Sequence, residues 1–340
     1  MKKVILFFSL ALNLLSACKR DDVVDEDNTY TLSPPSYFPS VLYPLENNPI
    51  SKEGFELGKK LFNDPRLSID NSVACSNCHV KAVAFTDPQH NPSVGVFEQS
   101  GTRNAPMIAN MAFQSEFLLD GGVSHLDFIP VFAIENKKEM GETISNVVVK
   151  LNRTADYPAL FKAAFAEIDT ITSPYMLKAI SQYMLLLISD NAKYDQMLRG
   201  EIAFSEEELQ GQTIFNEKCA TCHAGALFTN HQFINNGLDT TFADIGRALI
   251  TETNDDLGKF KVPSLRNSML TAPYMHDGRF KTIREVLDHY RFHVKNSPTL
   301  ANELHKSGQL GISLTDEEVD NIILFLETLT DYEFIANPKF

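Results

Sequence analysis

Two short stretches carry the residues best suited to chemistry. "CSNCH" spans residues 75–79, and "CATCH" spans residues 219–223. In each, two cysteines stand directly before a histidine, which could form a zinc half-site, a redox dithiol or the attachment site of a c-type haem. A zinc site would need all four cysteines around one ion, and neither zinc nor a dithiol uses the trailing histidines. The repeated pattern therefore predicts two covalent haem c groups.

The chain has five cysteines, and four of them belong to these motifs. In a c-type cytochrome both cysteine sulfurs form thioether bonds to the porphyrin, and the adjacent histidine is held as an axial iron ligand. The fifth is Cys18, so a lipid on Cys18 would leave no cysteine for a structural disulfide. The predicted haem-binding residues are Cys75, Cys78 and His79 for the first group and Cys219, Cys222 and His223 for the second.

The start of the chain has the features of an export signal. Lys2 and Lys3 precede an apolar run that is too short for an ordinary membrane span. The run ends in "LSAC", residues 15–18, which resembles the lipobox of bacterial lipoproteins and implies a lipid on Cys18 after cleavage. The alternative is a buried or disulfide-bonded Cys18. We expect a signal peptide at 1–17, a flexible tether at 18–50 and a periplasmic protein anchored to a bacterial membrane by lipid.

The composition limits the class of partner. With 44% hydrophobic and 22% charged residues over 340 positions, the chain is expected to be globular, with room for two domains. The net charge of −14 gives no basic surface, so we expect no nucleic-acid partner. An acidic surface could attract a small basic protein, although it is more often only a solvated surface.

Short repeated patterns predict helices around both motifs. "GKKLFN" at 58–63 and "GQTIFN" at 211–216 each precede a haem motif, with a glycine for close helix crossing and an apolar pair facing the porphyrin. Ser205 with Glu208 and Thr315 with Glu318 have the spacing of capping boxes. The second of these opens an amphipathic closing helix. We therefore predict a mainly α fold with two cytochrome-c-like helical domains, at 51–203 and 204–340.

Several longer motifs point to a known family. The two CxxCH motifs occur in order with "TRNAP" (102–106), "DGG" (120–122), "KEMGE" (138–142) and "KVPSLRNSMLTAPYMHDGRF" (261–280). Over roughly residues 50–330 the chain resembles the bacterial di-haem cytochrome c peroxidase family, which includes the MauG-type enzymes. The resemblance implies that the first haem reacts with peroxide and that the second haem accepts and relays electrons.

A peroxide-reacting haem needs a nearby acid–base group that moves a proton between the peroxide oxygens. The family places a glutamate before a methionine for this purpose, which corresponds to Glu139 followed by Met140. Glu135 is a weaker candidate. From the residues alone, Glu139 is one charge in a solvated run, so its catalytic role is what the resemblance implies.

The chain departs from the family at three positions. Peroxidase members carry a histidine that caps the first iron until reduction, and Val96 stands at that position. His90 could substitute for it, although a lone loop histidine is more often exposed. The family's tryptophan between the haems corresponds to Leu119, and a family glutamine corresponds to Ile129.

The resemblance also implies a calcium ion between the domains. Its ligands would be the side chain of Asn104 and the backbone carbonyls of Thr271 and Pro273. Hard oxygen ligands supplemented by water suit calcium. The alternative is that Asn104 only caps a turn.

The sixth ligand of the second haem is predicted within "TIREVLDHYRFH", residues 282–293. Thr282 and Glu285 have capping-box spacing, so a helix should begin there. MauG-type members place a tyrosine, and peroxidase members a methionine, fourteen residues after the histidine of His-Asp-Gly. Counting from His276 gives Tyr290. The competing ligands are Met275 and His293.

These features together predict a di-haem peroxidase that reduces hydrogen peroxide to water with electrons from an external donor. Two alternatives stay open: MauG-type oxidation of a protein or small-molecule substrate, and a non-catalytic di-haem electron-transfer cytochrome. The expected partners are hydrogen peroxide, a small cytochrome c or other periplasmic donor, the membrane through Cys18 and, as an open option, a second copy in a homodimer.

Overall fold

The structure is a computed structural model that describes residues 30–306 and 308–340. The predicted signal peptide (1–17), Cys18 and the first part of the predicted tether lie outside these residues. Within the described part, no helix combines the length and the apolar character needed to cross a membrane.

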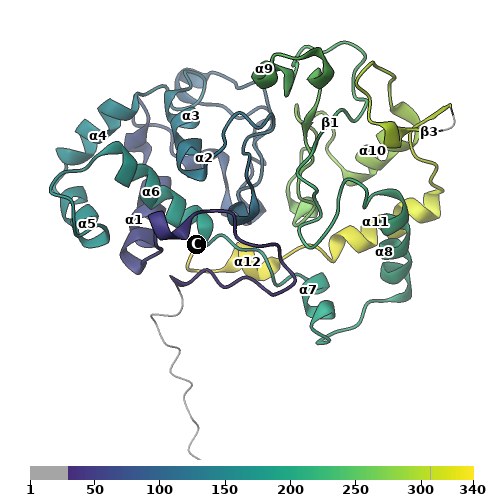
Figure 1. Cartoon of the computed structure of the whole chain (residues 1–340), viewed down its shortest axis with the longest axis horizontal. Helices are drawn as coiled ribbons and strands as arrows, with labels where there is room; N and C mark the ends of the chain where they lie inside the picture. The colour runs from purple at the N-terminus through teal and green to yellow at the C-terminus, as the bar shows by residue number, and fades with distance from the viewer. Residues whose placement is uncertain (1–29, 307) are drawn as a thin grey trace, which may run out of the picture.

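The fold is mainly α-helical and consists of two lobes, as predicted (Figure 1). Each lobe is built around its own hydrophobic core. The first lobe contains α1 (Lys52–Phe62), α2 (Cys75–Cys78), α3 (Ile129–Glu135), α4 (Ile144–Asn152), α5 (Tyr157–Ala164) and α6 (Ser173–Leu185). The helices that follow are α7 (Lys193–Leu198), α8 (Glu206–Lys218), α9 (Ala248–Thr251), α10 (Ile283–Asp288), α11 (Asp316–Glu327) and α12 (Tyr332–Ala336).

Strands play a small part in the described chain. They form two short antiparallel pairs, and Phe233 stands opposite Lys261 in the first pair. The pairs are β1 (Phe233–Ile234) with β2 (Phe260–Lys261), and β3 (His305–Lys306) with β4 (Gln309–Leu310).

The same helix crossing occurs once in each lobe. In the first lobe α1 crosses α6, and a methyl group added at Gly58 would overlap the carbonyl oxygen of Ala179. In the second lobe α8 crosses α11, and a methyl group at Gly211 would overlap the carbonyl oxygen of Asn321. The predicted role of both glycines in close helix crossing is therefore confirmed.

This crossing gives a stability prediction. G211A should lower the free energy of unfolding by about 1–3 kcal/mol, because α11 must move away to make room for the new methyl group. The gain in helix propensity from glycine to alanine is only about 1 kcal/mol. Chemical denaturation followed by circular dichroism measures the change. G101A is the control, because a methyl group there would lie 3.6 Å from its nearest neighbour, the Ser93 carbonyl oxygen. Equal midpoints for G211A and the parent would contradict the prediction.

A second repeated element follows each haem motif, and the sequence reading missed it. Residues 106–110 and 263–267 share the pattern Pro-x-(Ile/Leu)-x-Asn. Both asparagines have left-handed backbone, with φ of 56° at Asn110 and 59° at Asn267, and each begins a short 3-10 helix. The backbone N–H groups of these two asparagines donate to the carbonyls of Leu187 and Leu329, just beyond α6 and α11. The element therefore ties each haem-motif loop to the end of its crossing helix.

The predicted capping boxes are confirmed. In all three, the hydroxyl accepts from the backbone N–H three residues on, and the glutamate accepts from the backbone N–H of the capping residue. They are Ser205 with Glu208 before α8, Thr282 with Glu285 before α10, and Thr315 with Glu318 before α11. The amphipathic closing helix is also present as α11, with Val319, Ile322 and Leu326 buried.

The segment from residue 30 to 50 differs from the predicted tether. Phe38 and Tyr43 are each only 8% exposed, and the Tyr43 hydroxyl donates to Asp127 at 2.8 Å. The backbone N–H of Leu42 donates to the Ala112 carbonyl. The Pro/Ser-rich composition predicted a solvated chain, but its aromatic side chains bury enough apolar surface to hold the segment against the first lobe.

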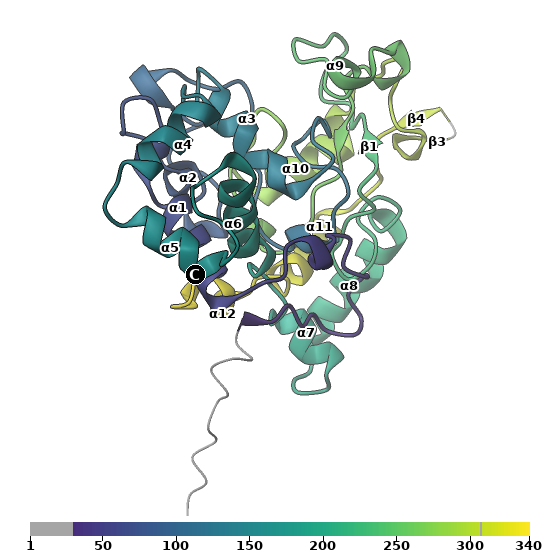
Figure 2. The same ribbon diagram turned by 60° about the vertical axis from the view of Figure 1, so that its left-hand side comes forward.

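The boundary between the lobes also differs from the predicted division. Tyr194 of α7 packs against Phe228 with ring centroids 5.0 Å apart, so the second lobe begins before residue 204. At the other end, α12 leaves the second lobe and returns to the first. There Phe334 packs on Phe85, with ring centroids 5.6 Å apart. Figures 1 and 2 both place the C-terminus against the first lobe.

A buried ion pair stands where the lobes meet. Arg266 and Asp195 are both fully buried, and two parallel hydrogen bonds of 2.8 Å join them. The hydroxyl of Tyr37 also donates to Asp195 at 3.0 Å, and the Arg266 guanidinium lies 4.7 Å from the Phe38 ring centroid. The N-terminal segment thus packs directly on this pair.

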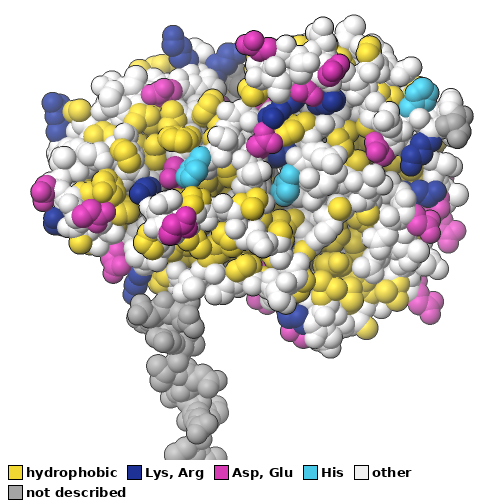
Figure 3. Space-filling model, viewed as in Figure 1, with side chains coloured by type: hydrophobic (Ala, Val, Ile, Leu, Met, Phe, Trp, Pro, Cys, Tyr) yellow, Lys and Arg dark blue, Asp and Glu magenta, His cyan; other side chains and the backbone are white. Residues whose placement is uncertain are grey.

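The surface carries charges of both signs. On the face seen in Figure 3, Lys and Arg side chains are interspersed with Asp and Glu, and apolar areas lie over both lobes.

Candidate functional site

The first CxxCH motif forms a short helix that is followed by an oriented histidine. α2 spans Cys75–Cys78, and the Nδ1 atom of His79 lies 2.8 Å from the carbonyl oxygen of Phe85. Burial lowers the pKa of His79, which favours the neutral ring. A neutral ring that donates from Nδ1 leaves Nε2 available as a metal ligand.

The second motif repeats this arrangement at the end of α8. The Nδ1 atom of His223 lies 3.2 Å from the carbonyl oxygen of Phe228, and burial lowers the pKa of His223 to about 4. Phe85 and Phe228 both have left-handed backbone, with φ of 62° and 52°, which turns their carbonyls towards the histidines. Sequence reasoning missed these phenylalanines, although each closely follows its CxxCH motif and could have been found as part of the repeat.

The thiols are unlike those of a redox dithiol. The four cysteines of the motifs are unpaired, and burial raises the pKa of Cys75 and of Cys219 to about 12. A reactive dithiol needs a lowered thiol pKa. Among the described residues, no three His, Cys, Asp or Glu side chains gather in a metal-binding group, so the two motifs do not share one zinc site. The haem interpretation is the one that the geometry fits.

Glu139 lies beside the first motif. It follows α3 in a tight loop, where the amide of Asn136 donates to its carboxylate at 2.7 Å. Its charge is close enough to act on the thiols of Cys75 and Cys78. Glu139 is exposed, but nearby protein atoms partly desolvate its carboxylate, and this desolvation raises the pKa of Glu139. Glu135 has a different contact, because its carboxylate accepts from the Ile144 N–H at the start of α4.

Val96 packs against the Glu139 loop. The Val96 N–H donates to the Glu139 carbonyl at 2.8 Å, and the Val96 side chain is 1% exposed. A methyl group at Gly95 would overlap the backbone of Lys138 and Glu139, so only glycine permits this approach. His90 instead lies at the surface, 48% exposed, with Nδ1 3.5 Å from an Asp87 carboxylate oxygen.

Two candidate ligands of the second haem come together around one asparagine. The amide of Asn236 lies 3.3 Å from the Met275 sulfur and also interacts with the Tyr290 side chain. Burial raises the pKa of Tyr290 to about 12, and its neighbours include Cys219 and Cys222. Sequence reasoning did not single out Asn236.

Tyr290 stands in a π-helix, His289–His293, that continues α10. A π-helix shifts the register of the side chains, and such turns are frequent at functional sites. This shift turns His293 to the surface, where it is exposed. Of the three candidates, Tyr290 lies near the cysteines of the second motif, Met275 contacts Asn236, and His293 is exposed.

The residues predicted for calcium are partly brought together. The Asn104 amide nitrogen lies 2.5 Å from the Pro273 carbonyl oxygen and 3.4 Å from that of Met275. The amide oxygen and nitrogen are interchangeable by rotation, so Asn104 can offer its oxygen to a cation at the same place. The Thr271 hydroxyl lies 3.3 Å from the Ser268 carbonyl. The Asn104 amide and the Pro273 carbonyl therefore lie side by side.

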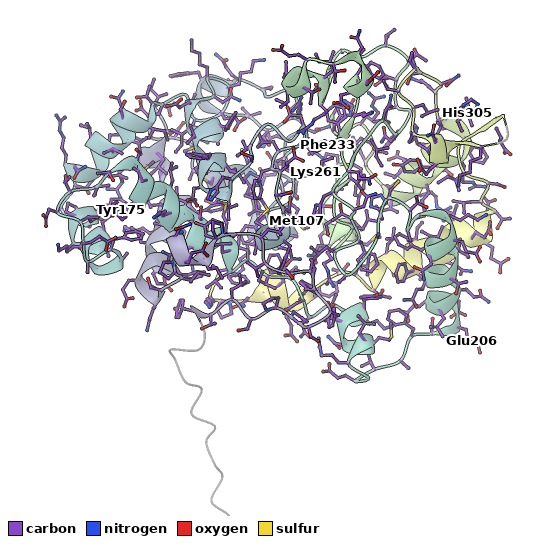
Figure 4. The ribbon with its side chains drawn as sticks, in the orientation of Figure 1. Met107, Tyr175, Glu206, Phe233, Lys261 and His305 are labelled. Carbon is purple, nitrogen blue, oxygen red and sulfur yellow. The ribbon has the colours of Figure 1, made fainter. Side chains whose placement is uncertain are left out.

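The region between the lobes lacks the family's tryptophan. Leu119 occupies that position, and its carbonyl accepts from the backbone N–H of Lys261 at 2.8 Å. The Lys261 ammonium donates to Gln114 and to the Glu116 carbonyl, and burial lowers the pKa of Lys261 to about 8. Figure 4 places Lys261 at the seam between the lobes. Ile129, which replaces the family's glutamine, is the first residue of α3.

Comparison with known proteins covers both lobes. Residues 52–203 match the family model described as di-haem cytochrome c peroxidase, and residues 209–330 match cytochrome c. The methylamine utilization protein MauG of Methylophilus methylotrophus is 31% identical over 297 residues, which cover 85% of this chain and 86% of that protein. The cytochrome c551 peroxidase of Pseudomonas aeruginosa is 29% identical over 332 residues, which cover 95% of this chain and 90% of that protein.

Solved structures agree with this grouping. A MauG-like protein associated with microbial copper homeostasis matches with a TM-score of 0.84 at 32% identity, covering 91% of this chain and 98% of that one. The diheme peroxidase BthA from Burkholderia thailandensis has the same fold, with a TM-score of 0.73 at 20% identity. The match covers 84% of this chain and 87% of that one. With matched relatives along most of its length, this chain belongs to the di-haem cytochrome c peroxidase family, whose members include MauG-type enzymes, and is an oxidoreductase with two covalent haem c groups.

Proposed function

We propose that this protein is a di-haem peroxidase that reduces hydrogen peroxide to water with two electrons from an external donor, such as a small cytochrome c. His79 would hold the iron of the peroxide-reacting haem, and His223 would hold the iron of the relay haem. The observation that carries the proposal is the position of Glu139 beside the first CxxCH motif, with its carboxylate held by Asn136.

When bound, the first haem would supply the iron at which peroxide can be reduced. The role of the protein side chains is to move protons. Peroxide must lose a proton from one oxygen and gain one on the other before the bond between the oxygens breaks, and Glu139 can accept and return that proton. Its raised pKa brings the carboxyl closer to the pH at which both steps are efficient.

The MauG-type alternative is favoured by one residue. A tyrosine ligand would stabilise oxidised iron at the second haem, whereas methionine would raise its potential. Tyr290 therefore favours oxidation of a protein or small-molecule substrate. The absence of tryptophan from the whole sequence weighs against it. A plain electron-transfer cytochrome has no use for an acid–base group such as Glu139.

Steady-state kinetics separate these functions. A peroxidase should consume hydrogen peroxide with reduced cytochrome c as donor, two donor molecules being oxidised for each peroxide. A MauG-type enzyme should consume peroxide slowly with that donor and oxidise another substrate instead. A transfer cytochrome should exchange electrons with the donor and leave peroxide unchanged, and this outcome would refute the proposal.

The resting state of the first haem is a further prediction. Because Val96 has no ligating atom, we expect the first iron to be five-coordinate or water-bound, and high-spin, in the fully oxidised protein. Peroxide should then react without prior reduction. Electron paramagnetic resonance of the resting protein measures the spin state, and H90A should leave it unchanged. A low-spin signal that becomes high-spin in H90A would show that His90 caps the iron.

The ligand of the second haem can be tested by substitution. Y290F should change the spectrum of the second haem and raise its reduction potential, because a phenolate ligand favours oxidised iron. Spectroelectrochemistry measures both effects. M275L is the matched control and should leave the spectrum unchanged. A sulfur–iron charge-transfer band in the far red that survives in Y290F and disappears in M275L would assign the ligand to Met275.

The remaining assignments extend the proposal. We propose that Asn104, Thr271 and Pro273 bind calcium between the lobes, that Cys18 carries the lipid anchor, and that the protein works in the periplasm. The proximity of Asn104 to the Pro273 carbonyl supports the calcium site.

A further inference from the structure

A run of aromatic rings leads from the first haem motif to the protein surface. The His79 ring lies 6.4 Å from Phe62, and Phe62 lies 5.1 Å from Tyr183. From Tyr183 the run continues to Phe55 at 5.4 Å and then to Tyr30 at 5.3 Å, all between ring centroids. The three middle rings are at most 2% exposed.

The run ends at a tyrosine that has a proton acceptor. The Tyr30 hydroxyl donates to the Glu56 carboxylate at 3.0 Å. Two ammonium groups lie near the same ring, Lys339 at 4.2 Å and Lys52 at 6.0 Å from its centroid. Positive charge beside the ring opposes a cationic radical, so loss of an electron from Tyr30 requires loss of its phenolic proton. Glu56 is in position to take it.

The second lobe differs at the equivalent position. In the repeated helix crossing, Phe325 of α11 lies 5.1 Å from Phe215, just as Tyr183 of α6 lies 5.1 Å from Phe62. A phenol is far easier to oxidise than a phenyl ring. The second lobe does contain Tyr194, but this residue comes from α7 and lies outside the crossing pair. An oxidisable ring at the crossing thus belongs to the lobe that carries Glu139.

We propose that Tyr183 and Tyr30 form a redox relay that carries one oxidising equivalent from the first haem to the surface when no electron donor is bound. The relay rests on the proposed peroxide reaction. In the net step Tyr30 loses one electron to the oxidised haem centre and its phenolic proton to the Glu56 carboxylate. The products are a neutral tyrosyl radical, a protonated Glu56 and a haem centre reduced by one electron. Tyr183 passes the electron on and ends the step unchanged.

The relay would protect the site. An oxidising equivalent that stays beside Glu139 and the first motif would attack nearby side chains. At Tyr30 it can be removed by a small one-electron reductant in solution.

Radical labelling of the holoprotein tests the relay. One equivalent of hydrogen peroxide is added without donor, with a nitroso spin trap present, and the adducts are located by peptide mass spectrometry. We expect a trap adduct on Tyr30 that falls at least about tenfold in Y183F. E56Q should lower the adduct several-fold, because the proton then has no carboxylate to accept it. Y175F is the matched control on the same helix. Tyr175 lies away from the seam in Figure 4 and packs on Phe165, outside the run, so labelling of Tyr30 should not change.

A second oxidant separates the relay from the peroxide reaction. Flash photolysis with a ruthenium(III) oxidant can oxidise the haem centre without peroxide, and the tyrosyl radical is then followed by its transient absorbance. We expect a signal that decreases in both Y183F and Y30F. If peroxide leaves the haem spectrum unchanged but the flash produces this signal, the proposed function fails and the relay stands. A Tyr30 adduct and a flash signal that are the same in Y183F as in the parent would overturn the relay.

Discussion

E139Q should slow peroxide cleavage by about 10²–10⁴-fold, while the spectra of both haems persist. Glutamine keeps the shape of the side chain and can still contact Asn136, but it cannot accept and return a proton. Rapid mixing of the oxidised protein with hydrogen peroxide measures the rate of cleavage without a contribution from the electron donor.

The matched control is E135Q. Glu135 lies four residues earlier, at the end of α3, and its carboxylate accepts from the Ile144 N–H, so its role in the described structure is to hold the start of α4. We expect the E135Q rate to stay near that of the parent. A normal rate in E139Q together with a slow rate in E135Q would transfer the acid–base role to Glu135.

The pH dependence gives an independent check on Glu139. The ionised carboxylate must accept the first proton, so kcat/KM should be highest above the Glu139 pKa and fall as the pH drops through it. Because burial raises this pKa, the fall should begin above the usual range of a glutamate. The acidic limb should disappear in E139Q.

D195N should lower the free energy of unfolding by about 3–5 kcal/mol, because it leaves the buried Arg266 charge without its partner. Both side chains have no solvent exposure, so water cannot replace the lost carboxylate. Urea denaturation of the holoprotein, followed separately by haem absorbance and circular dichroism, measures the change.

Two comparisons make this result specific to the buried pair. E201Q breaks the exposed pair in which the Arg199 Nε lies 2.7 Å from the Glu201 carboxylate, and it should cost no more than about 1 kcal/mol. The double variant D195N/R266M removes both charges and should be more stable than D195N alone. A D195N protein as stable as the parent would mean that water reaches Arg266.

Local sequence patterns predicted the parts of this protein whose contacts are local. The three capping boxes depend on residues within a few positions of one another, and the structure forms them as expected. Glu139 could be selected only through the family resemblance, because nothing in its immediate sequence separates it from the charges beside it. Its electrostatic interaction with Cys75 links distant segments of the chain, which periodicity does not encode.

The sequence predictions that were wrong also concern contacts between distant segments. Residues 30–50 were expected to be solvated from their composition, yet Phe38 and Tyr43 find a buried place on the first lobe. The amphipathic pattern predicted a helix around Tyr290, but not the π-helical turn that separates Tyr290 from His293. That turn contacts a distant segment, because the Nε2 atom of His289 lies 3.0 Å from the Asn236 carbonyl oxygen.

The return of α12 to the first lobe has a consequence for the order of folding. Phe334 packs on Phe85, whose carbonyl orients His79, and Lys59 of α1 donates to the carbonyl of Lys339. These contacts join segments that lie up to 280 positions apart in the chain, and such pairings form slowly because a long loop must close first. During vectorial synthesis or translocation the first lobe emerges early, but its core lacks these side chains until the last residues follow. The lobe that is first in the sequence is therefore the last to be completed.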